Sequence, residues 1–157
     1  AAYCSREIDN DIHNILSTIV VLPPFQNKGY GRILIALCYE IGRRKQLPGG
    51  PERPLSDLGE RAFCSFWKDR IIECLRDYGN KIRKIEHLVC LTAIEFESIE
   101  SILEKFNLAR ITPGKSTITV NQDVLRTEIE ALAQKHRSPS FHYRKLVWFP
   151  DHDITDI

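Results

Sequence analysis

The sequence has little that would place it in a membrane, or among strongly charged nucleic-acid binders. It contains no apolar run long enough to span a bilayer and no signal-peptide pattern at its start. Its 22 basic and 21 acidic residues leave a net charge of +1, which gives no support for an extensive nucleic-acid-binding surface. It also has no repeats or low-complexity tracts. These absences predict a soluble globular chain of one or two small domains in the cytosol or the nucleus.

The cysteines and histidines form no pattern that is typical of a metal centre or a disulfide framework. The cysteines are odd in number, show no C-x-x-C spacing and fall mostly inside apolar helical stripes. They are Cys4, Cys38, Cys64, Cys74 and Cys90. The histidines show no metal or triad spacing; they are His13, His87, His136, His142 and His152. The sequence therefore predicts reduced thiols and no metal site within these residues.

What the sequence does contain is a glycine turn between an apolar β-branched run (15–22) and a helix-like run (30–45). The turn, residues 26–31, reads Gln-Asn-Lys-Gly-Tyr-Gly. Pro23 and Pro24 stop the strand and remove two donors, so the next free N–H groups lie in the turn. A strand, a tight turn and a helix start direct these groups and the positive end of the helix dipole at one point. The context favours a phosphate-binding turn, whereas G-x-G alone usually marks only a turn.

Two stretches resemble the MYST family of histone acetyltransferases. The first is Leu22-Pro23-Pro24-Phe25-Gln26-x-Lys28-Gly29-Tyr30-Gly31-Arg32-x-Leu34-Ile35, followed by Tyr39-Glu40. The second is Gly50-Pro51-Glu52-Arg53-Pro54-Leu55-Ser56-Asp57-Leu58-Gly59. The resemblance covers nearly the whole chain. It implies an α/β (α+β) fold: a GNAT-like acyl-CoA N-acyltransferase core, of which this chain holds the C-terminal half.

The resemblance implies transfer of an acetyl group from acetyl-CoA to the ε-amine of a histone-tail lysine. Such an amine is almost fully protonated at neutral pH, so it needs a base before it can attack a thioester. Glu52 stands at the family's catalytic glutamate position and would be that base. From composition alone, the same residue would be an ordinary loop carboxylate.

The same resemblance assigns a set of residues to acetyl-CoA binding. They are Ile19, Val20, Val21, Gln26, Asn27, Lys28, Gly29, Tyr30, Gly31, Arg32, Ser56 and Ser65. Residues 26–32 would bind the pyrophosphate, and residues 19–21 would line the acetyl-pantetheine arm. Ser56 and Ser65 would hydrogen-bond the cofactor. From the residues alone, Ser56 is equally well a helix cap, while Lys28 and Arg32 belong to a solvated face.

The chain departs from the family at one position and lacks another family feature. Most members have a cysteine where this sequence has Thr18. Because threonine cannot readily carry an acetyl group, we expect direct attack in a ternary complex. The family's zinc finger and the first half of its core have no counterpart here, so zinc would belong only to an absent upstream finger. The start of the chain is expected to be a truncation.

The chain is expected to divide into two regions. Residues 1–79 would be the C-terminal half of the acetyltransferase core, and residues 80–157 a winged-helix-like region. We predict strands at 1–5, 15–22 and 146–149, helices at 30–45, 57–78 and about 121–135, and two helices and a hairpin (109–112, 117–120) between 80 and 120. Capping boxes are predicted at Asp57 with Glu60 and at Thr92 with Glu95.

Three functional interpretations remain open. The first is a nuclear histone lysine acetyltransferase that works with subunits of a chromatin-modifying complex and has no membrane contact. The second is a catalytically weak or inactive acetyl-CoA-binding scaffold, which Thr18 would permit. The third is a winged-helix nucleic-acid reader, which is weakened by four acidic residues on the would-be recognition helix. They are Glu95, Glu97, Glu100 and Glu104, and they make direct DNA binding unfavourable.

Overall fold

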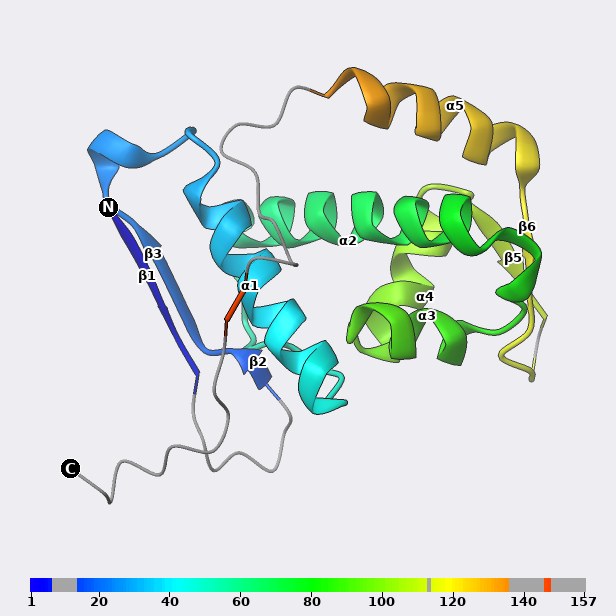
Figure 1. The fold of residues 1–157 in the computed structure, drawn as a ribbon, viewed down its shortest axis with the longest axis horizontal. Helices are drawn as coiled ribbons and strands as arrows, with labels where there is room; N and C mark the ends of the chain where they lie inside the picture. Colours follow the sequence, from blue (N-terminus) through cyan, green and yellow to red (C-terminus); the bar gives the residue numbers. More distant parts are fainter. Residues whose placement is uncertain (7–13, 113, 136–145, 148–157) are drawn as a thin grey trace.

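One long helix, α2 (Asp57–Tyr78), lies at the centre of the protein. The computed structural model describes residues 1–6, 14–112, 114–135 and 146–147. Four shorter helices contact α2, with α5 along one side and α3 and α4 on the other (Figure 1). These are α1 (Tyr30–Lys45), α3 (Ile85–Thr92), α4 (Phe96–Lys105) and α5 (Gln122–Gln134). The fold is therefore mixed α/β, with small sheets beside a helical core.

The predicted strand at 15–22 is two strands with different partners. β3 (Thr18–Val21) pairs antiparallel with β1 (Ala2–Ser5), as expected for neighbouring strands. β2 (Asn14–Leu16) instead pairs in parallel with the two-residue strand β4 (Gly50–Pro51). The chain changes partner at Ser17, whose N–H donates to the Ser5 carbonyl at 2.9 Å. This switch brings the 46–54 loop against the end of a strand.

The two long helices are joined by an aromatic cluster. Both have the predicted bounds. The apolar face of α2 is buried, whereas Tyr78 at its end is 46% exposed; the buried residues are Phe63, Phe66, Trp67, Ile71, Cys74 and Leu75. Trp67 Nε1 donates a hydrogen bond to the Tyr39 hydroxyl at 2.8 Å. The Tyr39 and Phe66 rings stack at 5.3 Å. Burial raises the pKa of Tyr39, so the hydroxyl stays neutral. This cluster fixes α1, which follows the glycine turn, against α2.

Both predicted capping boxes are wrong. Ser56, not Asp57, caps α2, because its hydroxyl accepts the Gly59 N–H at 3.1 Å. Thr92 ends α3 instead of starting α4, and its hydroxyl donates to the Leu88 carbonyl at 2.7 Å. The side chain of Glu95, the N-cap residue of α4, makes no capping hydrogen bond. The cap of α2 thus lies one residue earlier than predicted, and α4 begins without a side-chain cap.

The second half has the predicted order of two helices and a hairpin. β5 (Ala109–Ile111) and β6 (Ile118–Val120) pair antiparallel, and α5 follows with Asn121 as its cap. One buried cluster contains residues from both predicted regions. The winged-helix geometry, the GNAT-like core and the boundary at Gly79 stay predictions. Of the predicted strand at 146–149, residues 146–147 are not in a strand and the rest lies outside the described residues.

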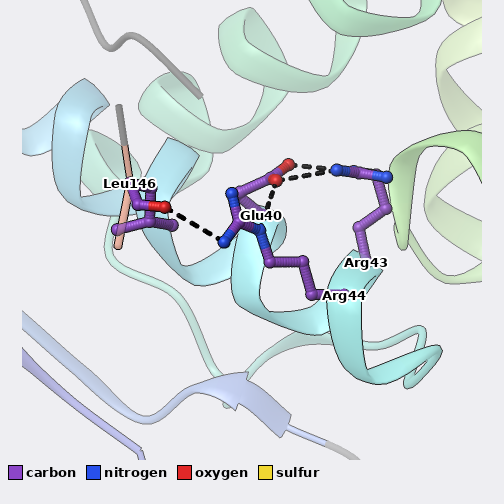
Figure 2. Close-up of polar contacts among 4 residues, drawn as sticks. All are labelled: Glu40, Arg43, Arg44 and Leu146. Carbon is purple, nitrogen blue, oxygen red and sulfur yellow. Dashed lines mark hydrogen bonds and ion pairs between the residues drawn. The ribbon is translucent and has the colours of Figure 1, made fainter. Parts of the chain in front are cut away.

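A buried carboxylate ties the end of α1 to a distant segment. Glu40 is 3% exposed and accepts hydrogen bonds from Arg43 Nη2 at 2.7 Å and Arg44 Nε at 2.8 Å. Figure 2 shows Arg44 also reaching the carbonyl of Leu146, to which Nη1 donates at 3.1 Å. The basic end of α1 therefore does more than complement the helix dipole. It neutralises Glu40 and anchors residue 146.

The Glu40 cluster predicts a loss of stability in acid. Burial raises the pKa of Glu40, but the hydrogen bonds and charges of Arg43 and Arg44 outweigh it and hold that pKa below its ordinary 4.5. A depressed folded-state pKa adds stability above the unfolded-state value, and this stability is lost as the pH falls from about 4.5 through the lower folded-state value. Glu40→Gln should lower the free energy of unfolding at pH 7 by about 1–3 kcal/mol.

Urea denaturation at several pH values checks this prediction. The deficit of Glu40→Gln should shrink below about pH 4.5, because the wild type then loses the same charge. Glu60→Gln, which changes an exposed carboxylate on α2, is the matched control and should change stability by less than about 0.5 kcal/mol. An equal deficit at pH 3 and pH 7 would show that charge is not the cause.

Candidate functional site

A cavity of about 440 Å³ lies between β3, the glycine turn and the starts of α1 and α2. Ten of the residues that were assigned to the cofactor line it, from all three of the predicted segments. They are Ile19, Val20, Val21, Gln26, Asn27, Gly29, Tyr30, Gly31, Arg32 and Ser56. The structure therefore brings together residues that are spread over 38 positions, from 19 to 56.

The glycine turn presents the start of α1 to this cavity. Gly29 is the N-cap residue and has φ 84°, a left-handed conformation that glycine adopts without strain. Asn27 is also left-handed, with φ 58°, and asparagine tolerates this better than most residues. The first N–H groups of a helix have no partner within the helix, and they carry the positive end of its dipole. The turn can therefore bind an anion through backbone groups.

The polar side chains of the turn are directed differently from what the sequence indicated. Gln26 Nε2 donates to the Val21 carbonyl at 3.0 Å, so this side chain closes the turn on β3. Lys28 Nζ lies 5.8 Å from the centre of the Phe25 ring, and Lys28 is not among the cavity-lining residues. Much of the anion recognition available here therefore comes from the backbone.

Arg32 is engaged by a buried carboxylate on α2. Its Nη2 lies 2.9 Å from Asp69 Oδ2, and Lys135 Nζ lies 2.8 Å from the other oxygen of Asp69. Asp69 is only 2% exposed, although the apolar periodicity of residues 57–78 predicts that it lies on the solvated face of the helix. This prediction is wrong because two cations, from α1 and from just beyond α5, cover the carboxylate. Arg32 therefore lines the cavity while its guanidinium is paired with Asp69, a carboxylate that it shares with Lys135.

The two predicted serines lie on different sides of α2. Ser56 lines the cavity and also caps the helix. Ser65 is exposed and lines a separate hollow with Cys64, Lys68 and Lys105. Nine positions are about two and a half helical turns, so the two residues face opposite ways. Direct cofactor contact by Ser65 stays a prediction.

Sequence reasoning missed several residues that complete the cavity wall. They are Phe25, Ile35, Leu58, Gly59, Ala62 and Phe63. The last four lie on the first two turns of α2, and Gly59 and Phe63 follow Ser56 at helical spacings of three and seven residues. The small side chains of Gly59 and Ala62 were the available signal, because small residues on one helix face leave room for a ligand.

The glycine turn follows the C-terminal end of β3, and Glu52 is held near the N-terminal end of this strand. Its N–H donates to the carbonyl of Leu16 at 2.9 Å, which continues the pairing of β2 with β4. Leu16 comes two residues before Thr18, where β3 begins, and residues 19–21 of β3 line the cavity. The side chain of Glu52 is exposed. A carboxylate that can accept a proton therefore lies near the Thr18 end of the strand.

Two of the cysteine thiols, those of Cys38 and Cys74, are not suited to nucleophilic attack. Cys38 on α1 has its sulfur 3.7 Å from that of Cys4, and burial raises its pKa to about 12, with the neighbouring Cys4 adding to the shift. Burial likewise raises the pKa of Cys74 to about 11. Both thiols stay protonated at neutral pH. Within the described ranges, no group of three or more His, Cys, Asp or Glu side chains could hold a metal ion.

Comparison with known proteins places the chain in a family. The MOZ/SAS family matches residues 1–146. Histone acetyltransferase ESA1 of Eremothecium gossypii is 34% identical over 149 residues, which cover 94% of this chain and 33% of that protein. A putative MYST-like histone acetyltransferase 1 of Oryza sativa subsp. japonica is 34% identical over 148 residues, 94% of this chain and 32% of that protein.

Histone acetyltransferase ESA1 of Saccharomyces cerevisiae is 31% identical over 149 residues, which cover 94% of this chain and 33% of that protein. The chain thus spans about a third of the length of these relatives. The family match extends over both halves of the fold, including the cavity and the Glu52 loop. The protein belongs to the MOZ/SAS family, as the resemblance of its two motifs to MYST histone acetyltransferases predicted.

Proposed function

We propose that the protein is a histone lysine acetyltransferase in which this chain provides the acetyl-CoA site and the general base. The observation that carries the proposal is the cavity along β3. The glycine turn lies at one end of this strand, and the Glu52 loop lies next to its other end. The activity named for its relatives supports the same conclusion.

The cavity is suited to acetyl-CoA in its chemistry and its length. Backbone N–H groups of the glycine turn would hold the pyrophosphate, and the hydroxyl of Ser56 would donate a further hydrogen bond. The edge of β3, about 10 Å long at roughly 3.3 Å per residue, would guide the pantetheine arm toward the loop of Glu52. The acyl group would then lie near the carboxylate.

Glu52 would remove a proton from the attacking lysine. An ammonium group has no lone pair, so the amine must be deprotonated before it attacks the thioester carbonyl. The amine then forms the new amide bond while CoA leaves as the thiolate, which takes up a proton. Because Thr18 replaces the family's cysteine, the lysine would attack acetyl-CoA directly in a ternary complex.

The direct test is acetyl transfer from acetyl-CoA to histone-tail peptides by the complete protein that contains this chain. We expect acetylation of lysine, and acetyl-CoA binding by calorimetry with one site per chain. If acetyl-CoA binds but no peptide or intact histone is acetylated, the scaffold interpretation replaces this one. If acetyl-CoA does not bind, both fail.

Thr18 supplies a further prediction. Its side chain is exposed at the start of β3 and carries no thiol, so Thr18→Ala should keep kcat within about threefold of the wild type. Thr18→Cys, which restores the family residue, is the matched variant. A fall of several orders of magnitude in Thr18→Ala would mean that the hydroxyl takes part in the chemistry.

The proposal includes a nuclear location and a place in a chromatin-modifying complex. The acidic residues of α4 oppose a DNA-reading role, because Glu97 and Glu104 are exposed on it and would face the phosphates of DNA. No helix in the described ranges is both long enough and apolar enough to cross a membrane. A histone tail, which is rich in positive charge, is the partner that this chemistry fits.

A further inference from the structure

The carboxylate of Glu95, just before α4, lies against the loop that carries Glu52. A Cβ atom added to Gly50 would meet three atoms of the Glu95 carboxyl group before any other neighbour, closer than real Cβ atoms approach. Glu95 Oε1 also lies 3.2 Å from Arg53 Nη2. Residues on both sides of Glu52 in the loop are therefore in contact with one distant side chain.

The backbone of Glu95 reaches the same loop. The Glu95 N–H donates to the Gly49 carbonyl at 3.2 Å, and the Gly49 N–H donates to the Ala93 carbonyl at 3.0 Å. On its other side, the loop is held by β2, through Leu16 and Glu52 itself. The Glu52 loop is thus clamped between a strand of the first half and the helix start of the second half.

The side chain of Glu95 is held in one orientation. Ser98 Oγ donates to Glu95 Oε1 at 2.6 Å, and Ser98 is 3% exposed. The Glu95 side chain is 28% exposed, against 61% for Arg53. Glu95 is therefore the partner held by a further hydrogen bond, and Arg53 is the more exposed partner.

We propose that Glu95 is a positioning residue for Glu52: its carboxylate packs on Gly50 and retains the Arg53 guanidinium, so that Arg53 does not pair with the neighbouring Glu52 carboxylate. The proposal rests on the proposed function, in which Glu52 is the base. Without Glu95, Arg53 loses its carboxylate partner one residue from the base. A base that is displaced or paired accepts the proton of lysine less readily, so kcat falls while acetyl-CoA binding does not change.

Glu95→Gln in the complete protein tests this role, since it keeps the shape and the hydrogen bond from Ser98 but removes the charge. We expect kcat to fall about tenfold, with the Kd and KM of acetyl-CoA within about twofold of the wild type. Each kcat is divided by the number of acetyl-CoA sites counted by calorimetry, so that only folded protein is compared. Glu97→Gln, an exposed carboxylate on the same helix, is the matched control and should behave as the wild type.

Arg53 variants show whether the effect passes through the ion pair. Arg53→Gln should keep kcat near that of the wild type, because it removes the cation that could pair with Glu52. Glu95→Gln with Arg53→Gln should therefore recover part of the kcat that Glu95→Gln alone loses. Arg53→Lys keeps a cation for Glu95 and should retain most of the activity. Independent, multiplicative losses would overturn the proposal, because the two side chains would then act separately.

The outcomes separate this proposal from the proposed function. If the wild type transfers acetyl groups and Glu95→Gln matches Glu97→Gln in kcat, Glu95 has no positioning role. If Glu95→Gln only lowers the melting temperature, its role is structural and the proposal fails. Should Glu95→Gln not fold, Arg53→Gln decides: a tenfold fall in its kcat would refute the proposal, because no guanidinium is then left to pair with Glu52. A wild type without acetyl transfer refutes the proposed function itself.

Discussion

Glu52→Gln should slow acetyl transfer by roughly 10² to 10⁴ and leave acetyl-CoA binding unchanged. Glutamine has the shape of glutamate and keeps the backbone hydrogen bond to Leu16, but it cannot accept the lysine proton. The side chain is exposed at the end of β4 and is not among the cavity-lining residues, so its loss should not disturb the cofactor. Steady-state kinetics and calorimetry on the same preparation measure the two quantities.

The pH dependence gives this prediction a second readout. As pH rises toward the pKa of the lysine amine, more of the substrate is already deprotonated. The kcat/KM of Glu52→Gln should therefore continue to climb where that of the wild type has levelled off. Glu60→Gln, which changes an exposed carboxylate nearby on α2, should show the wild-type profile. Full activity of Glu52→Gln at neutral pH would exclude Glu52 as the base.

Gly29→Glu should weaken acetyl-CoA binding by at least about 100-fold, which is about 2.7 kcal/mol. The substitution puts a side chain and a negative charge at the helix start, where the pyrophosphate is proposed to lie. Arg32 cannot fully offset this charge, because it is already paired with Asp69. Isothermal calorimetry with acetyl-CoA measures the effect directly.

The backbone conformation of Gly29 calls for its own control. With φ 84°, any side chain at this position introduces strain of about 1–2 kcal/mol. Gly29→Ala has this strain without bulk or charge, so it should lower the melting temperature and weaken binding by less than tenfold. If Gly29→Ala and Gly29→Glu lose affinity equally, the turn is needed for the fold and not as an anion site. Unchanged affinity in Gly29→Glu would remove the pyrophosphate site from the turn.

Local patterns predicted the helices and the glycine turn, because these depend on residues close in the sequence. The α1 and α2 bounds follow from apolar periodicity, and the left-handed Gly29 follows from a turn between a strand and a helix. What the sequence did not reveal depends on contacts between distant residues. The break at Ser17 occurs because β2 and β3 pair with β4 and β1 respectively, and no local signal encodes such a change of partner.

The ion pairs at the candidate site could not be predicted from the sequence for the same reason: they join residues that are distant along the chain. Arg32 and Asp69 each look like solvated residues on their own helix, and their ion pair exists only because α1 crosses α2. Glu95 was read as part of an acidic helix face, yet its carboxylate contacts Gly50, 45 positions earlier. Helix geometry could have placed Ser65 opposite Ser56, since their spacing is known from the sequence.

The clamp on the Glu52 loop has a consequence for the order of events during synthesis. Domains form from the N-terminus as the chain leaves the ribosome, and residues 1–52 emerge well before Ala93 and Glu95. Until those residues emerge, Gly49 lacks two of its backbone hydrogen bonds, and Arg53 lacks its carboxylate partner. The nascent chain therefore completes the Glu52 loop only after α3 has been translated, and under the proposed function it would acquire competence for acetyl transfer late.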